Sequence, residues 1–320
     1  MVECEFGIWN LDIGIYVVLG AWILVLEESG RVNEERHFSR PIMKWHGWIG
    51  LAIIVVSEVL LFSGVSFVRT FFTPLVWSGY ILLVDSVVHL RKGKSLIVNR
   101  PGEFLLLLPL SVGFWLIFEF YNLYLRNWSY TGLPEERPLR LLGYGWAFAT
   151  IWPAILETAE VLEGWKGISG RKVRPWKVKK GHLVFSVIFG AFCLILPLIV
   201  SPRAAHYLAA PVWLGFIFLL DPINYWRGGD SLLGDLEKGN AGRFCSLLLA
   251  GLLCGFLWEF WNYWAGARWS YAVPIMGHIT IFEMPVLGYL GFPPFAVECF
   301  TMYALVRKYL SADSAASKGI

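Results

Sequence analysis

The chain has 320 residues, of which 57% are hydrophobic and 16% are charged, and its formal net charge is only +3. Soluble domains usually carry about 25% charged residues, so these proportions exclude an ordinary soluble enzyme. The abundance of apolar residues also excludes a disordered chain. A mean hydropathy of +0.57, with 17 Trp and 23 Phe, is typical of an integral membrane protein whose aromatic rings lie at the membrane interfaces.

Nine apolar runs follow one another along the chain, each close to the roughly 20 residues that a helix needs to cross a bilayer. The sequence therefore predicts an all-α, polytopic membrane protein with about nine transmembrane helices. These are expected over residues 8–26, 45–68, 71–90, 104–125, 141–162, 182–200, 206–226, 244–265 and 284–306. The first run has no Lys or Arg before it and no small-residue cleavage site after it. We therefore interpret it as a retained helix and not as a signal peptide.

The loops on alternate sides of these helices differ in their basic residues. One side holds the loops 27–44, 91–103, 164–181 and 226–243 with the C-terminal tail, and it carries 21 of the 27 Lys and Arg. Because basic loops are retained in the cytoplasm, this bias predicts an external N-terminus and a cytoplasmic C-terminus in the inner or plasma membrane. The basic run 171–180 either only sets this orientation or also contacts anionic lipid.

A four-helix unit occurs twice in the chain. At an offset of 136 residues Trp77 matches Trp213, and after a short insertion the run 118–122 (FEFYN) matches 258–262 (WEFWN). We predict an N-terminal helix and loop over 1–44, a first repeat over 45–163, a basic loop over 164–181, a second repeat over 182–308 and a tail over 309–320. Each repeat has an even number of spans, so the two copies run parallel around a pseudo-two-fold axis along the membrane normal.

Acidic residues within the apolar runs recur at matched positions of the two copies. A charge at bilayer depth costs about 2.5–3.5 kcal/mol, so such residues are candidates for function. No Lys or Arg lies at the same depth, so each carboxyl either is neutral and donates a proton or is ionised and binds a cation. The three pairs are Glu119 with Glu259, Asp85 with Asp221, and Glu157 with Glu298.

The first of these pairs is the leading catalytic candidate. Asn122 and Asn262 lie three residues after Glu119 and Glu259 on the same helix faces, so we expect each amide to hydrogen-bond and orient its carboxyl. Aromatic rings beside an acid suit a cationic ligand or a carbocation. The rings that we expect to line a substrate site are Tyr121, Trp258 and Trp261. Alternatively, the Glu–Asn pairs only hold helices together.

Three further acids have both a functional and a structural interpretation. Asp85 and Asp221 precede arginines by six residues, so a salt link or a helix-end contact explains them as well as substrate binding does. Glu58 has Leu194 at the position 136 residues later and is an unmatched acid. Such an acid either specialises one half of a duplicated scaffold or pairs with a neighbouring hydroxyl.

Four polar residues are expected toward the cytoplasmic side. Glu157 and Glu298 follow a helix proline by four residues, and a proline frees a backbone carbonyl near a polar cavity. We predict that these two acids relay protons, although they also fit a structural role. His46 and His182 lie beside lysines and are interpreted as interfacial anchors.

The sequence predicts no cofactor and no metal site. The five cysteines show no C-x-x-C spacing, and the histidines show no H-x-x-x-H spacing. The glycines at 228–229 do not form a phosphate-binding motif. We therefore expect no nucleotide, flavin or nucleic-acid partner, and the oligomeric state is left open.

One part of the second copy carries a set of motifs that is known from a family. The motifs are Trp258-Glu259, Trp269-Ser270-Tyr271, Ile281-Phe282-Glu283-Met284-Pro285 and Pro294-Phe295-Ala296. This stretch resembles the membrane-embedded lycopene cyclases of carotenoid synthesis, which are also duplicated. The family's acidic pair after the proline is absent, since Val286-Leu287-Gly288-Tyr289 follows Pro285. The resemblance implies an all-helical fold and an isoprenoid-like ligand, but not lycopene cyclisation.

The leading hypothesis is a membrane enzyme of the cyclase or isomerase kind acting on a lipid-soluble, isoprenoid-like substrate. Glu259, with Glu119 as its partner, would protonate the substrate, and the aromatic rings would stabilise the developing cation. One alternative is a transporter that couples to H⁺ or another cation through the same acids. Another is a non-catalytic protein that binds lipid. In each case the expected partner is a membrane lipid or a lipophilic small molecule.

Overall fold

The structure, a computed structural model, describes residues 43–316 and is mostly helical, at 75%. Seven helical segments of the described chain are long and apolar enough to cross a membrane, which supports a membrane protein. The long helices are α2 (Trp45–Phe62), α3 (Ser66–Lys92), α5 (Pro101–Leu125), α6 (Arg137–Ala149), α7 (Ile151–Glu163), α9 (Lys180–Ile199), α11 (Ala209–Trp226), α13 (Gly242–Trp264) and α14 (Phe292–Ala316). Short helices α4 (Leu96–Asn99), α8 (Lys166–Ser169), α10 (Pro202–Ala205), α12 (Leu232–Glu237) and the 3₁₀ helix η1 (Val286–Gly291) connect them.

The count of nine spans is not confirmed, and the differences have physical reasons. The run 8–26 lies outside the described residues. Helix α11 has 18 residues but is not among the seven, because Asp221, Pro222 and Asn224 lower its hydropathy. The run 141–162 is divided between α6 and α7 at Thr150, and the run 284–306 begins as strand β4 (Met284–Pro285) and η1 before α14. Helix α14 also continues beyond the predicted start of the tail at 309.

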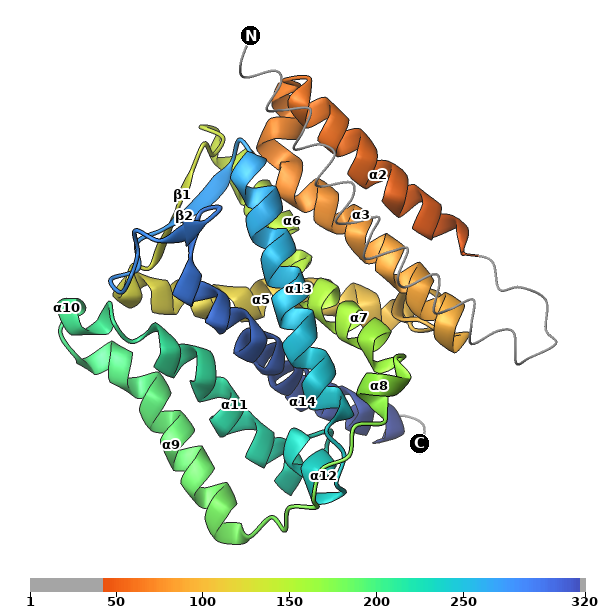
Figure 1. Cartoon of the computed structure of the whole chain (residues 1–320), viewed down its shortest axis with the longest axis vertical. Coiled ribbons are helices and arrows are strands. Elements are labelled where there is room, and N and C mark those ends of the chain that lie inside the picture. The colour runs from red at the N-terminus through yellow and green to blue at the C-terminus, as the bar shows by residue number, and fades with distance from the viewer. Residues whose placement is uncertain (1–42, 317–320) are drawn as a thin grey trace.

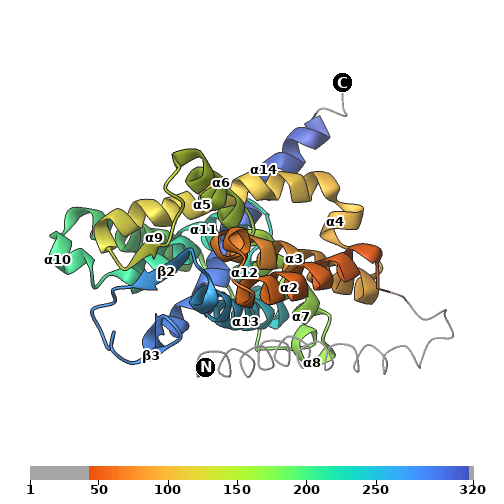
Figure 2. The same ribbon diagram turned by 90° about the horizontal axis from the view of Figure 1, so that it is seen from above.

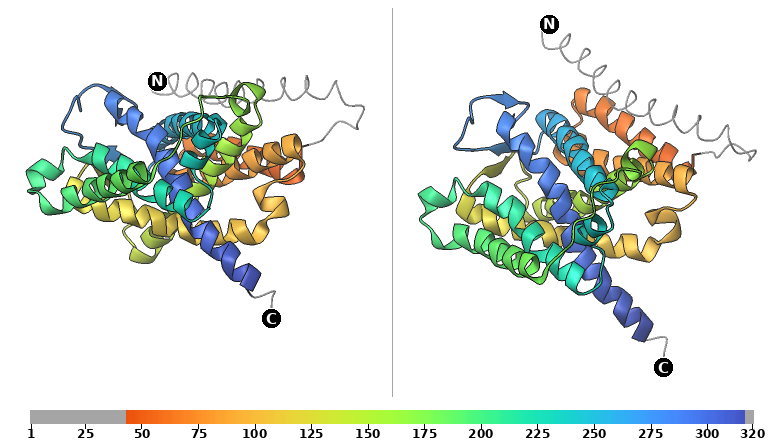
Figure 3. Two further views of the ribbon diagram at one scale, coloured as in Figure 1. Left: turned by 90° about the horizontal axis from the view of Figure 1, so that it is seen from below. Right: turned by 60° about the horizontal axis from the view of Figure 1, so that its bottom comes forward.

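We call residues 43–169 the first half and residues 170–316 the second half. Figure 1 shows the helix pair α2–α3 at one edge of the molecule and the pair α9–α11 at the opposite edge, with α7, α13 and α14 between them. Helix α13 lies against both α14 of its own half and α7 of the other half. Figures 2 and 3 show that the end of α14 projects beyond this bundle.

Each edge pair of helices is held in register by two glycines. A Cβ atom at Gly50 would lie 2.4 Å from the carbonyl oxygen of Gly79, so the α2 and α3 backbones touch. A Cβ atom at Gly190 would lie 2.7 Å from the carbonyl oxygen of Gly215, which gives α9 and α11 the same contact. Gly50 therefore corresponds to Gly190, 140 residues later. The counterpart of Glu58 is then Leu198, and the expected match with Leu194 is wrong.

A two-stranded ribbon joins the two halves at one end of the molecule. Strand β1 (Trp128–Thr131) follows α5, and strand β2 (Arg268–Tyr271) follows α13 (Figure 1). They pair antiparallel, and Ser129 lies opposite Ser270 at the centre of the register. A second ribbon, of β3 (Thr280–Ile281) and β4, belongs to the second half alone. We call the end with β1 and β2 the ribbon end.

Candidate functional site

Glu119 lies beneath strand β1 and accepts three hydrogen bonds on one oxygen. Its Oε1 accepts from the hydroxyl of Tyr130 at 2.5 Å and from the indole nitrogens of Trp115 and Trp128, both at 3.0 Å. Burial raises the pKa of Tyr130 well above its usual value, and the Glu119 charge raises it further. The tyrosine is therefore protonated at neutral pH and remains a donor. Three donors favour an ionised Glu119, which makes it a poor proton donor.

Glu259 occupies the same place beneath strand β2. Its Oε1 accepts from the hydroxyl of Tyr271 at 2.7 Å and from the indole nitrogen of Trp269 at 3.3 Å. Burial, followed by the Glu259 charge, raises the pKa of Tyr271 well above its usual value. The other oxygen of Glu259 is buried and has no hydrogen-bond partner. The two glutamates thus share the same kind of site, with one more donor at Glu119.

The expectation that the two asparagines orient these carboxyls is wrong. The Asn122 amide donates to the Trp128 carbonyl at 2.8 Å, and its oxygen accepts from the Asn127 backbone at 2.9 Å. Asn262 holds both backbone groups of Trp269, at 2.8 and 2.9 Å. Each strand starts just after its helix ends, so its unpaired backbone groups lie within reach of an amide in the last turn. The Glu–Asn motif therefore positions the ribbon.

Glu157 and Glu298 are the most deeply buried acids of the candidate set. Their exposed fractions are 1% and 0%, and all four carboxyl oxygens lack a hydrogen-bond partner. Glu157 lies in α7 next to the Asp85 carboxyl, within electrostatic range of Glu160 and Arg100. Glu298 lies in α14, one turn after the buried ring of Phe295. Buried polar groups normally have partners, so two matched exceptions need an explanation.

An aromatic cluster fills the region between the halves, with Phe295 near its centre. The Phe295 ring contacts five rings from both halves, with centroids 5.3–6.0 Å away. These rings belong to Trp115, Phe118, Trp152, Trp213 and Trp258. Glu298 follows Phe295 by three residues on the same helix, so its carboxyl lies on the face that this cluster covers.

Two residues predicted to line a substrate site instead connect the halves. The Trp261 indole on α13 donates to Glu58 on α2 at 3.0 Å, and Glu58 is only 6% exposed. Tyr121 on α5 donates to the Leu194 carbonyl on α9 at 3.1 Å. Each half thus reaches to the first long helix of the other, but only one of these contacts involves a carboxylate.

Asp85 and Asp221 bind the first turn of a short helix. Asp221 accepts from the backbone nitrogens of Leu232 and Leu233 at 2.7 and 2.9 Å, at the start of α12. Asp85 accepts from the backbone nitrogen of Ile97 at 2.7 Å, in the first turn of α4. A carboxylate is favoured there because the first amides of a helix have no intrahelical acceptor. The structural interpretation of these two acids therefore accounts for their contacts.

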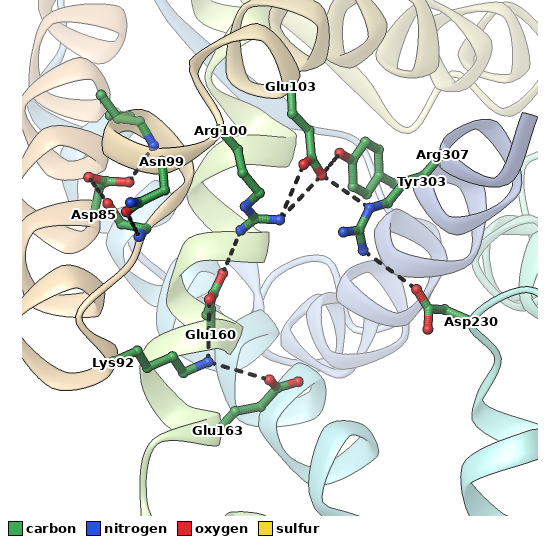
Figure 4. A network of polar contacts seen from close by, with 12 residues as sticks. Asp85, Lys92, Asn99, Arg100, Glu103, Glu160, Glu163, Asp230, Tyr303 and Arg307 are labelled. Atoms are coloured by element: carbon green, nitrogen blue, oxygen red, sulfur yellow. Dashed lines mark hydrogen bonds and ion pairs between the residues drawn. The ribbon is translucent and has the colours of Figure 1, made fainter. Parts of the chain in front are cut away.

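A charged network joins the halves at the end of α5 opposite the ribbon (Figure 4). Glu103 in the first turn of α5 accepts from the Tyr303 hydroxyl and forms ion pairs with Arg100 at 3.3 Å and Arg307 at 3.2 Å. Arg100 also pairs with Glu160 on α7 at 3.3 Å. Because α5 has 25 residues and rises about 1.5 Å per residue, this end lies about 37 Å from the ribbon along the helix. We call it the network end.

The predicted site residues therefore divide into separate groups. The two ribbon glutamates bind tyrosines and tryptophans, and Glu157 and Glu298 lie deeper, toward the network end. Within the described residues, no hydrogen bond joins an acid to its counterpart in the other half, and no group of three or more His, Cys, Asp or Glu is placed to hold a metal ion. Sequence reasoning missed Tyr130 and Tyr271 as glutamate partners, although the repeated Trp-Ser-Tyr triplet was visible. It also missed Glu103, whose partners come from the other half.

No protein-family model, no curated protein and no solved structure matches this chain. The resemblance of residues 258–296 to lycopene cyclases is therefore still an expectation from the sequence.

Proposed function

We propose that this protein is a membrane-embedded enzyme that protonates a lipid-soluble, isoprenoid-like substrate, with Glu298 as the acid and Glu157 as its partner. The observation that carries the proposal is the complete burial of both carboxyls without a single hydrogen-bond donor. An ionised group at bilayer depth costs several kcal/mol, so the surroundings of these two residues suit a carboxylic acid that holds a proton. The choice of Glu298 over Glu259 rests on this difference in donors.

The aromatic cluster supports a substrate on which positive charge develops. Protonating a carbon–carbon double bond produces a carbocation, and the faces of Trp and Phe rings stabilise cations electrostatically. Trp258 and Trp213 contact Phe295, one helical turn from Glu298. In this proposal the acid supplies the proton and these rings stabilise the cation. The carboxylate left on Glu298 then receives a proton from the aqueous side.

We also infer that the two halves are parallel copies of one four-helix unit. The matched glycine contacts, the paired strands and the twin Glu–Asn motifs support this inference. The basic bias of the loops favours an inner or plasma membrane with the network end and the C-terminus in the cytoplasm and the N-terminus outside. With this orientation, the network end is the side from which protons arrive.

A proton-coupled transporter is a second candidate, and the charged network favours it. The ion pairs of Arg307 with Glu103 and with Asp230 connect α14 to α5 and to the loop before α12. Partly exposed ion pairs contribute little stability, so they can break when two halves move apart. Alternating access around the buried acids would need such a contact.

Lipid analysis combined with a flux assay separates these candidates. Total lipids are extracted from cells that contain the wild-type protein, Glu298→Gln, or Glu135→Gln as a control at an exposed loop acid. The enzyme proposal predicts a lipid change that depends on the protein, persists in Glu135→Gln and disappears in Glu298→Gln. Unchanged lipids together with proton flux in proteoliposomes would favour the transporter. Unchanged lipids without flux would overturn both and leave a lipid-binding role.

A further inference from the structure

His46 and Asp85 form a buried pair near the network end of the first half. His46 Nε2 lies 3.0 Å from Asp85 Oδ2, and the two side chains are 7% and 0% exposed. The same Asp85 oxygen accepts from the Ser95 hydroxyl at 2.8 Å, while Oδ1 accepts from the Ile97 backbone. Asp85 therefore does more than bind the start of α4, because one of its oxygens is shared with a titratable ring.

The pair is continuous with the buried acid Glu157. The Glu157 carboxyl on α7 lies beside that of Asp85 on α3 and has no hydrogen-bond donor of its own. Glu160 on α7 and Arg100 before α5 are the other charged groups near Glu157. The remaining basic groups near Asp85 and His46 are Lys44, before α2, and His89 on α3. The resulting row of three groups is His46, Asp85 and Glu157.

The second half lacks this row although it keeps both acids. Asp221, the match of Asp85, binds backbone amides through both of its oxygens. The glycine register places Ser186 at the position of His46, and the Ser186 hydroxyl donates to the Phe218 carbonyl at 2.8 Å. His182, the match by sequence offset, stacks on Trp176 outside the bundle. A titratable ring meets the aspartate in the first half alone.

We propose that His46 and Asp85 transfer protons between water at the network end and Glu157, so that protons enter the membrane core through the first half. This inference rests on the proposed role of Glu157 as a proton-holding acid. A protonated His46 gives its Nε2 proton to Asp85 Oδ2, and Asp85 passes a proton to the ionised Glu157. The neutral imidazole then takes its next proton from water, so one proton moves and no other bond changes. His46 and Asp85 are positioning and relay groups and do not touch the substrate.

Infrared difference spectroscopy of the full-length protein in D₂O measures this step without a substrate. Exchange of the carboxyl proton shifts the carbonyl stretch of a carboxylic acid, and Glu157→Gln identifies the band. His46→Gln keeps a nitrogen donor for Asp85 but cannot carry the proton. It is expected to slow exchange at Glu157 by about tenfold or more, and added imidazole should restore the rate. His182→Gln, the matched control, should exchange at the wild-type rate.

A wild-type exchange rate in a folded His46→Gln would overturn the relay. If His46→Gln does not fold, the wild-type protein still provides a test, because the exchange rate should change with the titration of one histidine. A rate that does not vary between about pH 5 and 8 would exclude His46. The outcome is independent of the lipid assay. Slowed exchange with unchanged lipids would keep the relay and reject the enzyme, and a lipid change with unaltered exchange would do the reverse.

Discussion

The two ends of the molecule connect the same two halves by different chemistry. At the ribbon end the connection is made by paired backbones, with Ser129 opposite Ser270, supported by buried tyrosine and indole donors. At the network end it is made by side chains that remain partly exposed, since Arg307 and Asp230 are 45% and 50% exposed. Exposed ion pairs are weakened by salt, whereas buried hydrogen bonds are not. The ribbon end is therefore expected to be the stable connection and the network end the one that opens.

The sharpest way to break the ribbon is to remove its acceptor. Glu119→Ala leaves the hydroxyl of Tyr130 and two indole nitrogens without their acceptor, so we expect the free energy of unfolding to fall by about 3 kcal/mol. Unfolding in mixed detergent, followed by circular dichroism, measures this change, with Glu135→Ala as an exposed control. A loss equal to that of the control would show that the ribbon does not depend on Glu119.

Removing one asparagine should have a smaller effect of the same kind. Asn262→Ala deletes the two hydrogen bonds to the Trp269 backbone and is expected to cost about 2 kcal/mol. Asn122→Ala should cost a similar amount, because its amide holds β1 in the same way. The same detergent titration tests both. A large loss in one variant and none in the other would contradict the equivalence of the two Glu–Asn motifs.

Alkaline pH should weaken the ribbon end selectively. The pKa of Tyr130 is raised in the folded protein by burial and then by Glu119, so folding favours the protonated phenol. This contribution to stability is present below the ordinary tyrosine value of 10.0 and is lost as the pH rises through the folded value. Stability measured from pH 8 upward should begin to fall near pH 10, and Tyr130→Phe should remove part of that fall. A Tyr130→Phe variant with the wild-type pH dependence would contradict the assignment.

The smallest effect on stability is expected at the network end. Arg307→Gln removes ion pairs with Glu103 and Asp230 and should cost less than about 1 kcal/mol. Hydrogen exchange at the start of α5 should nevertheless rise, and the difference from wild type should disappear at about 1 M salt, where screening is strong. A change in exchange at β1 instead would place the mobile end at the ribbon.

Sequence reasoning located the helices because bilayer thickness and hydropathy determine where apolar runs must lie. It also identified the paired acids, since a duplication repeats the residues that both copies need. It could not assign their partners. The contact of Asn262 with Trp269, and not with Glu259, depends on where α13 ends relative to β2. The counterpart of Glu58 depends on the glycine contacts between helices, which shift the offset from 136 to 140.

The network end was missed for a different reason. Glu103 and Arg307 lie about 200 residues apart in the chain and show no local pattern. Only the packing of α14 near the start of α5 brings them together. By contrast, Tyr130 and Tyr271 belong to a repeated triplet, so a stricter reading of the duplication would have included them with the glutamates.

The protonation state of the matched acids at neutral pH tests the central claim most directly. Infrared spectra of the wild-type protein are compared with those of Glu298→Gln, Glu157→Gln and Glu119→Gln. The account predicts carboxylic-acid bands that disappear in Glu298→Gln and in Glu157→Gln and remain in Glu119→Gln. Bands that persist in the first two variants and disappear in the third would contradict it, because the proton-holding acid would then lie at the ribbon end.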